Sequence, residues 1–284
     1  MTHSNLTNGV HLVGSIPLST NEEVYYDKVA KESYQRFLQL RAKGVISPKV
    51  RFQVSIPTPY ECVQGHVRSE FQAQLEPFYE RRISDVVESI LSAIPAEYLA
   101  IQSDSCFMIT ALEYERGRLP GDFFKPHFFP IHEGILERAR RSCALVPSNV
   151  PLGWHLCYGD LGHKHFIEPE DLSLLVDVAN DLVRCIPGDT DLSWLHMPVP
   201  KNRDDTTYFE PLKRLKAGDK TKLYRGLVHP NDEEGTFRRL QAARNVIPGR
   251  DFGVSTECGM GRTPKEELAS ILQISKNVTK AETA

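Results

Sequence analysis

Two short segments, far apart in the sequence, carry side chains that could bind a soft metal ion. Gly153–Asp160 contains His155 and Cys157, and Thr256–Arg262 contains Cys258. Side chains alternate along a strand, so His155 and Cys157 should point to the same face. An imidazole and two thiolates are three of the ligands that an open catalytic zinc site uses. The sequence therefore predicts a zinc site at these three residues. The alternative is plain burial, because free cysteine behaves as a small hydrophobe.

Other polar residues also lie where apolar, strand-like runs end. His196 could be a fourth metal ligand, or its ring could simply hydrogen-bond a backbone carbonyl. His229 precedes Pro230, and an imidazole that titrates near neutrality suits general acid–base catalysis. Asp104 could receive a cation or a hydroxyl of a substrate, or could be a structural aspartate. These residues extend the predicted site from metal binding to catalysis.

Two further residues are predicted to bind substrate. Arg262 closely follows Cys258 and could hold a carboxylate or phosphate with two parallel hydrogen bonds. Ser15 follows Gly14 after an apolar run, although Gly-Ser is also common in ordinary turns. Glu257 should point away from Cys258 if the strand continues, so it is not expected among the ligands.

The elements that must position these residues can be read from hydrophobic periodicity. Apolar runs ending at polar, Gly or Pro positions predict strands at Val10–Ile16, Val50–Ile56, Tyr98–Ser103, Leu152–Cys157, Leu192–Met197, Leu223–Val228 and Phe252–Thr256. Helical patterns fill the gaps at Glu22–Ala42, Phe71–Ala93, His132–Cys143, Pro169–Cys185, Glu233–Val246 and Pro264–Val278. Alternating strands and helices imply parallel pairing with right-handed crossovers.

This alternation predicts an α/β fold, a single (β/α)8 TIM-type barrel in which chemistry sits at the carboxyl ends of the strands. The pattern shows one strand fewer than eight, because the stretch 43–49 is too short for a strand and a helix, so the barrel is expected to be irregular or incomplete around strand two. The chain has 284 residues, against about 250 for such a barrel. We expect one domain over residues 1–284, with flexible ends at 1–9 and 277–284.

Composition narrows the class of partner. A formal net charge of −3 argues against a nucleic-acid or anionic-membrane partner. No apolar run approaches the roughly 18 residues of a membrane span, and the N-terminus does not resemble a secretory signal. The six cysteines show no disulfide-scaffold spacing, which favours free thiols or metal ligands. We therefore expect a cytoplasmic protein that acts on a small molecule.

At these residues the chain resembles the catalytic C-terminal barrel of cobalamin-independent methionine synthase, in the superfamily that also contains uroporphyrinogen decarboxylase. The family's His-x-Cys zinc pair looks like His155 and Cys157, and its later Cys-Gly ligand looks like Cys258-Gly259. Its carboxylate-binding Ile-Gly-Ser turn is similar to Val13-Gly14-Ser15. The resemblance places the aspartate for the substrate ammonium at Asp104 and the proton-shuttling histidine at His229.

The chain also departs from that family. His196 stands where the family has a glutamate ligand, and Ser105 replaces the Glu that follows the strand-four aspartate. The tryptophan that stacks on folate has no counterpart near Val63. The resemblance therefore implies Zn²⁺ and a thiol or amino-acid-like substrate, without implying methionine synthesis from folate.

The sequence thus favours a zinc-dependent methyl or alkyl transferase that activates a thiol, with His229 as the proton donor or acceptor. A metal-free lyase or decarboxylase of the uroporphyrinogen type is the first alternative, in which Asp104 stabilises a cationic intermediate and Arg262 holds a carboxylate. A non-catalytic barrel is the second, because the same barrel hosts many functions.

Overall fold

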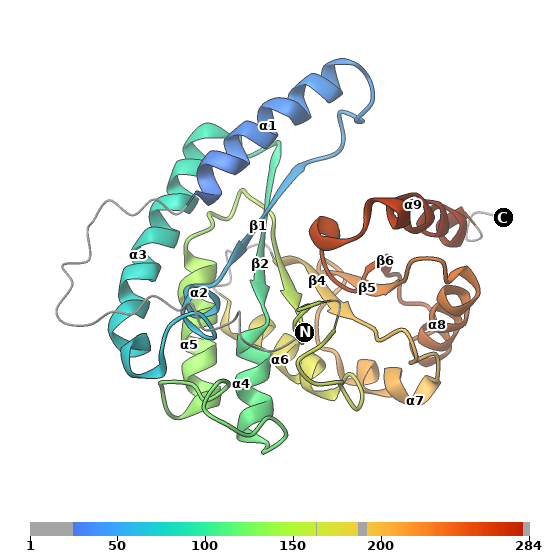
Figure 1. Ribbon diagram of the computed structural model, residues 1–284. Coiled ribbons are helices and arrows are strands. Elements are labelled where there is room, and N and C mark those ends of the chain that lie inside the picture. The colour runs from blue at the N-terminus through green and yellow to red at the C-terminus, as the bar shows by residue number, and fades with distance from the viewer. Residues whose placement is uncertain (1–24, 163, 187–191, 281–284) are drawn as a thin grey trace.

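The computed structural model describes residues 25–162, 164–186 and 192–280. Its centre is a parallel sheet of six strands, in which each strand pairs with the next one along the chain. The strands are β1 (Phe52–Pro57), β2 (Leu99–Ser105), β3 (Leu152–Leu156), β4 (Leu192–Pro198), β5 (Lys222–Val228) and β6 (Gly253–Thr256). The sheet curls into an open half-barrel with β1 and β6 at its edges (Figure 1).

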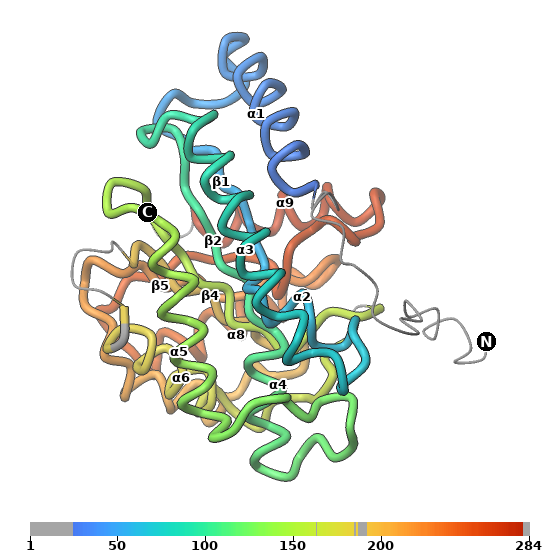
Figure 2. The backbone as a smooth tube through the Cα atoms, turned by 90° about the vertical axis from the view of Figure 1, so that its left-hand side faces the viewer, coloured from blue at the N-terminus to red at the C-terminus, as the bar shows by residue number. Residues whose placement is uncertain are grey.

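Helices follow the strands and cover the outer, convex side of this half-barrel (Figure 2). The longer ones are α1 (Tyr26–Ala42), α3 (Ser69–Ala93), α4 (Phe107–Glu115), α5 (Ile131–Ala144), α6 (Ser173–Cys185), α8 (Glu233–Val246) and α9 (Lys265–Lys280). The shorter ones are α2 (Pro59–Val63), α7 (Thr206–Phe209), η1 (Glu210–Arg214) and η2 (Met260–Arg262). Helix α1 packs against α3 and β1, and α9 packs against β5, β6 and α8. No helix of the described ranges is both long and apolar enough to traverse a lipid bilayer.

Alternation along the strands separates an apolar convex face from a polar concave face. Trp154, Leu195 and Leu227 are fully buried between the sheet and the helices. Their neighbours His155 and His196 point to the concave side, where they line a cavity. A parallel strand covered on one face by helices buries apolar side chains there. No helix of the described ranges covers the opposite face of this sheet, so that face can carry polar groups.

The strand and helix predictions are largely confirmed. Six of the seven predicted strands are present, each within a few residues of its expected bounds. The predicted strand Val10–Ile16, and Ser15 within it, lie outside the described residues. Helices α2, α4 and α7 were not predicted, because each is short and follows a strand or a loop without a long periodic pattern.

The closed eight-stranded barrel is not what the described residues form. Their sheet has six strands, and β1 and β6 do not pair with each other, so the architecture is a partial TIM-type barrel. Residues 43–51, which join α1 to β1, form turns and contain no strand. The described residues therefore agree with the irregularity expected in this region.

Candidate functional site

The predicted site begins with three residues in register on adjacent strands. Asp104 of β2 pairs with His155 of β3, and His155 pairs with His196 of β4. All three line the concave face near the carboxyl ends of their strands. In TIM-type folds, this end of the strands is where catalytic groups gather.

The three residues predicted from the sequence to bind metal lie close together in the structure. Donor atoms of His155, Cys157 and Cys258 all lie within 4.8 Å of one another. His155 and Cys157 come from β3 and its end, and Cys258 comes from the turn after β6. Cys258 Sγ lies 3.5 Å from His155 Nε2. Two sulfurs and an imidazole nitrogen therefore converge from opposite parts of the sheet.

These distances fit a tetrahedral zinc ion. Bonds of about 2.3 Å to sulfur and 2.0–2.1 Å to nitrogen place the two donors about 3.6 Å apart at a tetrahedral angle. The observed separation between Cys258 Sγ and His155 Nε2 is 3.5 Å. The donor set is also soft enough for zinc. The residues present thus fit the ion that the family resemblance implies.

The two thiols differ in their tendency to ionise. A hydrogen bond with Cys157, aided by one with His155, lowers the pKa of Cys258 to about 4. The same hydrogen bond and burial raise the pKa of Cys157 well above its usual value. The pKa of His155 is raised: burial lowers it, but Cys258 and Asp104 outweigh that effect. Without metal, Cys258 therefore ionises more readily than Cys157, and the surroundings of His155 favour its charged form more than water does.

His196 stands behind His155, away from the sulfurs. Its Nε2 lies 3.1 Å from the carbonyl oxygen of Thr256, to which an N–H can donate. Its Nδ1 hydrogen-bonds Nδ1 of His155, and the two rings stack with centroids 4.5 Å apart. If Nε2 of His196 carries hydrogen, Nδ1 accepts one from His155 and leaves Nε2 of His155 available to a metal. In this geometry both nitrogens of His196 already have hydrogen-bond partners. Metal ligation by His196 therefore stays a prediction.

Asp104 lies in the same concave layer, and a second polar residue holds it. Gln102 Nε2 donates to Asp104 Oδ1 at 2.9 Å, and Gln102 Oε1 accepts from Trp194 Nε1 at 3.1 Å. Burial raises the pKa of Asp104, and the nearby ring of His155 opposes that rise. The carboxylate is therefore oriented and can accept a hydrogen bond from a bound molecule.

These residues line the first cavity, a space of about 860 Å³ along the concave face. Asp104, His155, His196 and Cys258 lie toward one end of it. Arg262 also lines it, and its Nη2 lies 2.8 Å from Asp160 Oδ2. The predicted role of Arg262 in binding a substrate anion stays a prediction, because its guanidinium is paired with Asp160.

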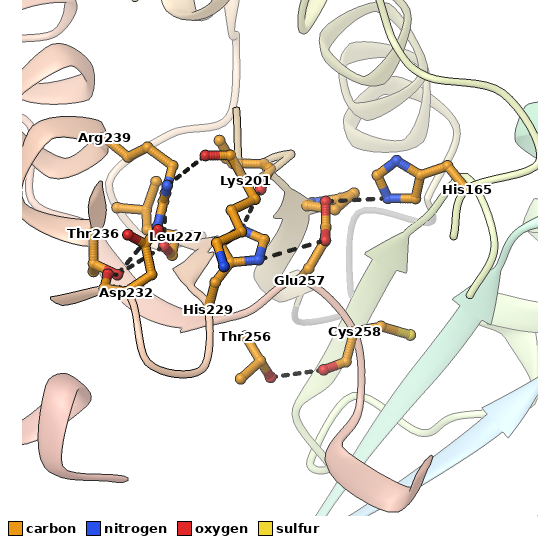
Figure 3. Close-up of polar contacts among 12 residues, drawn as sticks. His165, Lys201, Leu227, His229, Asp232, Thr236, Arg239, Thr256, Glu257 and Cys258 are labelled. Atoms are coloured by element: carbon orange, nitrogen blue, oxygen red, sulfur yellow. Dashed lines mark hydrogen bonds and ion pairs between the residues drawn. The ribbon is translucent and has the colours of Figure 1, made fainter. Parts of the chain in front are cut away.

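His229 lies in a second cavity of about 720 Å³, on the other side of the segment that contains Cys258. Its Nε2 lies 2.9 Å from the carbonyl oxygen of Val199, and its Nδ1 lies 3.9 Å from Glu257 Oε2. Glu257 Oε1 also forms an ion pair of 3.2 Å with His165 Nε2. Figure 3 shows the carboxylate of Glu257 between the two rings, with the side chain of Cys258 extending away from it. The acid–base role of His229 stays a prediction.

Several lining residues were not singled out from the sequence. Gln102, Trp194 and Lys222 lie on the concave face of the strands, within the first cavity. A closed barrel was expected, and the interior of a closed barrel is filled by packed side chains. A cue was present: polar residues at 53, 55, 102 and 222 occupy inward positions that a packed interior would fill with apolar groups.

Comparisons with known proteins bear on the fold. No protein-family model and no curated protein sequence matches the chain. A B12-independent methionine synthase from a Shewanella species, in complex with selenomethionine, is similar in structure, with a TM-score of 0.59 and 13% identity. That match covers 92% of this chain and 68% of the other. A Listeria monocytogenes protein, assigned as a vitamin-B12-independent methionine synthase, gives a TM-score of 0.48 and 17% identity over 83% of this chain and 66% of that one. The fold is thus similar to that of a methionine synthase.

Proposed function

We propose that this protein is a zinc-dependent methyl- or alkyltransferase whose acceptor is a thiol. The convergence of His155, Cys157 and Cys258 is the observation that carries the proposal. A methionine synthase of similar fold is compatible with it. The open concave face beside the cluster leaves room for a substrate.

Each residue has a distinct part in this proposal. Zinc would keep the bound substrate thiol as a thiolate, which is the nucleophilic form. His155, Cys157 and Cys258 would hold the ion, and His196 would fix the ring of His155. Asp104 would accept a hydrogen bond from a substrate ammonium or hydroxyl. His229 would exchange a proton through Nδ1, because Val199 holds its Nε2. Ser15 and Arg262 remain proposed substrate-binding residues.

Metal analysis of the purified protein tests this proposal. We expect about one zinc per chain in the natural protein and less than about a tenth of that in Cys157→Ser or Cys258→Ser. Cys62→Ser is the matched control, because Cys62 is a free cysteine outside the cluster and should leave the zinc content unchanged. Retention of full zinc by a folded Cys258→Ser protein would refute the proposal.

Metal binding should also release protons. Cys157 keeps its proton in the metal-free cluster, and the raised pKa of His155 favours a second one, whereas both groups must lose these protons to bind a metal. Zinc affinity should therefore rise with pH, by about tenfold per pH unit for each proton released. Calorimetry in buffers of different ionisation enthalpy counts the protons. Release of none would show that the metal binds elsewhere.

The metal-free lyase remains the second candidate because one observation favours it. The first cavity is lined by Lys49, Arg51, Lys220, Lys222 and Arg262, and Asp104 is the only carboxylate among the described residues that line it. A cation-rich cavity suits a substrate with several carboxylates. Activity that persists in the presence of a chelator would favour this candidate over the transferase.

A further inference from the structure

The first cavity has two chemically different ends. His155, His196 and Asp104 form one layer of inward side chains near the carboxyl ends of the strands. Lys222 pairs with Trp194, one inward position closer to the start of the strands, about 7 Å along the strand direction. Lys220 also lines the cavity and precedes β5. Strand register therefore places the sulfur ligands and the amines in the same cavity.

The described residues supply no competing anion to the lysines at this end. Lys220 and Lys222 are exposed, and neither forms an ion pair within the described ranges. Lys49 and Arg51, at the start of β1, line the cavity from the opposite edge of the sheet. Arg51 is partly engaged, because its Nη1 donates to the carbonyl oxygens of Ala96 and Leu99. Amines at one end of a cavity without a partner favour an anionic ligand group.

Two aromatic rings line the cavity, Trp194 in register with Lys222 and Tyr224 in register with His196. The indole of Trp194 packs on Gly153 so closely that a Cβ at that glycine would overlap it. The ring of Tyr224 packs on Gly253 in the same way. Both rings line the cavity, and the absence of side chains at the two glycines lets the rings lie against the sheet. Each of the two layers therefore offers apolar surface beside its polar groups.

We infer that the first cavity binds an elongated substrate with an anionic group at Lys220 and Lys222, a chain that runs along the rings of Trp194 and Tyr224, and its reacting end at the cluster of His155, Cys157 and Cys258. If the proposed function is correct, on which this part rests, the reacting end is a thiol. The substrate class is then a thiol whose chain ends in a carboxylate or a similar anion.

Thiol binding to the cobalt-substituted protein tests the inference. A thiolate bound to Co²⁺ gives a charge-transfer band, so mercaptohexanoate can be titrated against the uncharged mercaptohexanamide. We expect the carboxylate to bind about fivefold more tightly, and the preference to fall below about twofold in Lys220→Ala/Lys222→Ala. Lys213→Ala/Lys216→Ala is the control: it removes the same charge outside the cavity and should keep the preference.

A metal-free measurement separates the two proposals. The chain has two tryptophans, and Trp194→Phe gives the fluorescence background of Trp154. Nitrophenylbutanoate should quench Trp194 at lower concentration than its amide, and the lysine double variant should remove this difference.

Three outcomes are then informative. Equal binding of the charged and neutral probes, or a preference kept by Lys220→Ala/Lys222→Ala, would overturn the inference even if thiols bind cobalt. If thiols leave the cobalt spectrum unchanged but the quenching still depends on the charge of the probe, the transferase proposal would be wrong and the anion site would be supported. If the charged probe binds more tightly in both measurements, and Lys220→Ala/Lys222→Ala removes this preference, the transferase proposal and the anion site would both be supported.

Discussion

The two cavities that flank Cys258 differ in charge although they share a wall. The first carries Lys49, Arg51, Lys220, Lys222 and Arg262 against Asp104. The second carries the carboxylates of Asp160, Glu168, Glu257 and Glu267 against Lys164 and Lys201. Thr256, Cys258 and Gly259 line both. The same few residues therefore separate a basic compartment from an acidic one.

This difference shows how a short strand end can serve two sites. Glu257 and Cys258 are consecutive, yet the carboxylate meets His165 and His229 while the sulfur meets His155. Alternation of side chains along extended backbone gives each a different neighbour. Substitutions on one side should therefore leave the other side intact, and this separation can be tested.

The largest effect should come from filling the floor of the first cavity. Gly153→Val would drive a side chain into the indole of Trp194, with an expected loss of about 3 kcal/mol of unfolding free energy. Gly259→Ala is the control, because no atom lies within 4 Å of a Cβ added there, and it should stay within about 0.5 kcal/mol. Urea unfolding measures both. Equal stability of the two variants would mean that Trp194 does not pack on Gly153.

A smaller effect is expected from His196→Ala. Loss of the ring that orients His155 should weaken zinc binding by about 10- to 100-fold while the stoichiometry stays at about one. Competition with a chelating dye measures the affinity. His229→Ala, in the second cavity, should leave zinc affinity unchanged. Complete loss of zinc in His196→Ala would instead identify His196 as a ligand.

Glu257→Gln should alter the second cavity alone. Burial lowers the pKa of His165, but its ion pair with Glu257 outweighs this and raises the net pKa. Because the pKa of His165 is higher in the folded protein than its unfolded value of about 6.5, the ion pair stabilises the protein fully at pH values below about 6.5. This stabilisation is lost as the pH rises through the folded pKa. The natural protein should exceed Glu257→Gln in stability by about 1 kcal/mol near pH 5.5, and by less near pH 8. Urea unfolding at both pH values checks the sign, and a gap that widens with pH would contradict it.

The smallest effect is expected from the lysines of the second cavity. Lys164→Ala/Lys201→Ala removes two positive charges from that cavity, as Lys220→Ala/Lys222→Ala does from the first. The affinity for nitrophenylbutanoate should change less than about twofold, because local contacts rather than net charge hold the probe. A drop equal to that of Lys220→Ala/Lys222→Ala would show that the whole-protein field, and not the cavity, attracts anions.

Much of the fold was predictable because it depends on local periodicity. The strands around His155, His196 and Cys258 were recognisable from apolar runs that end in polar residues, and the longer helices from their apolar stripes. The short helix α4 was missed although Glu61 accepts hydrogen bonds from its first N–H groups, Phe107 and Met108. A contact between residues so distant in sequence leaves no local pattern.

Side-chain alternation alone predicted which residues share a face, His155 with Cys157, and that Glu257 points away from Cys258. The folded sheet was needed to show that β3 and the turn after β6 meet, that His196 contacts His155, and that His229 lines a separate cavity. Side-chain alternation is a property of a single strand and survives in any fold. Distances between strands depend on the register and curvature of the whole sheet, which non-local packing sets.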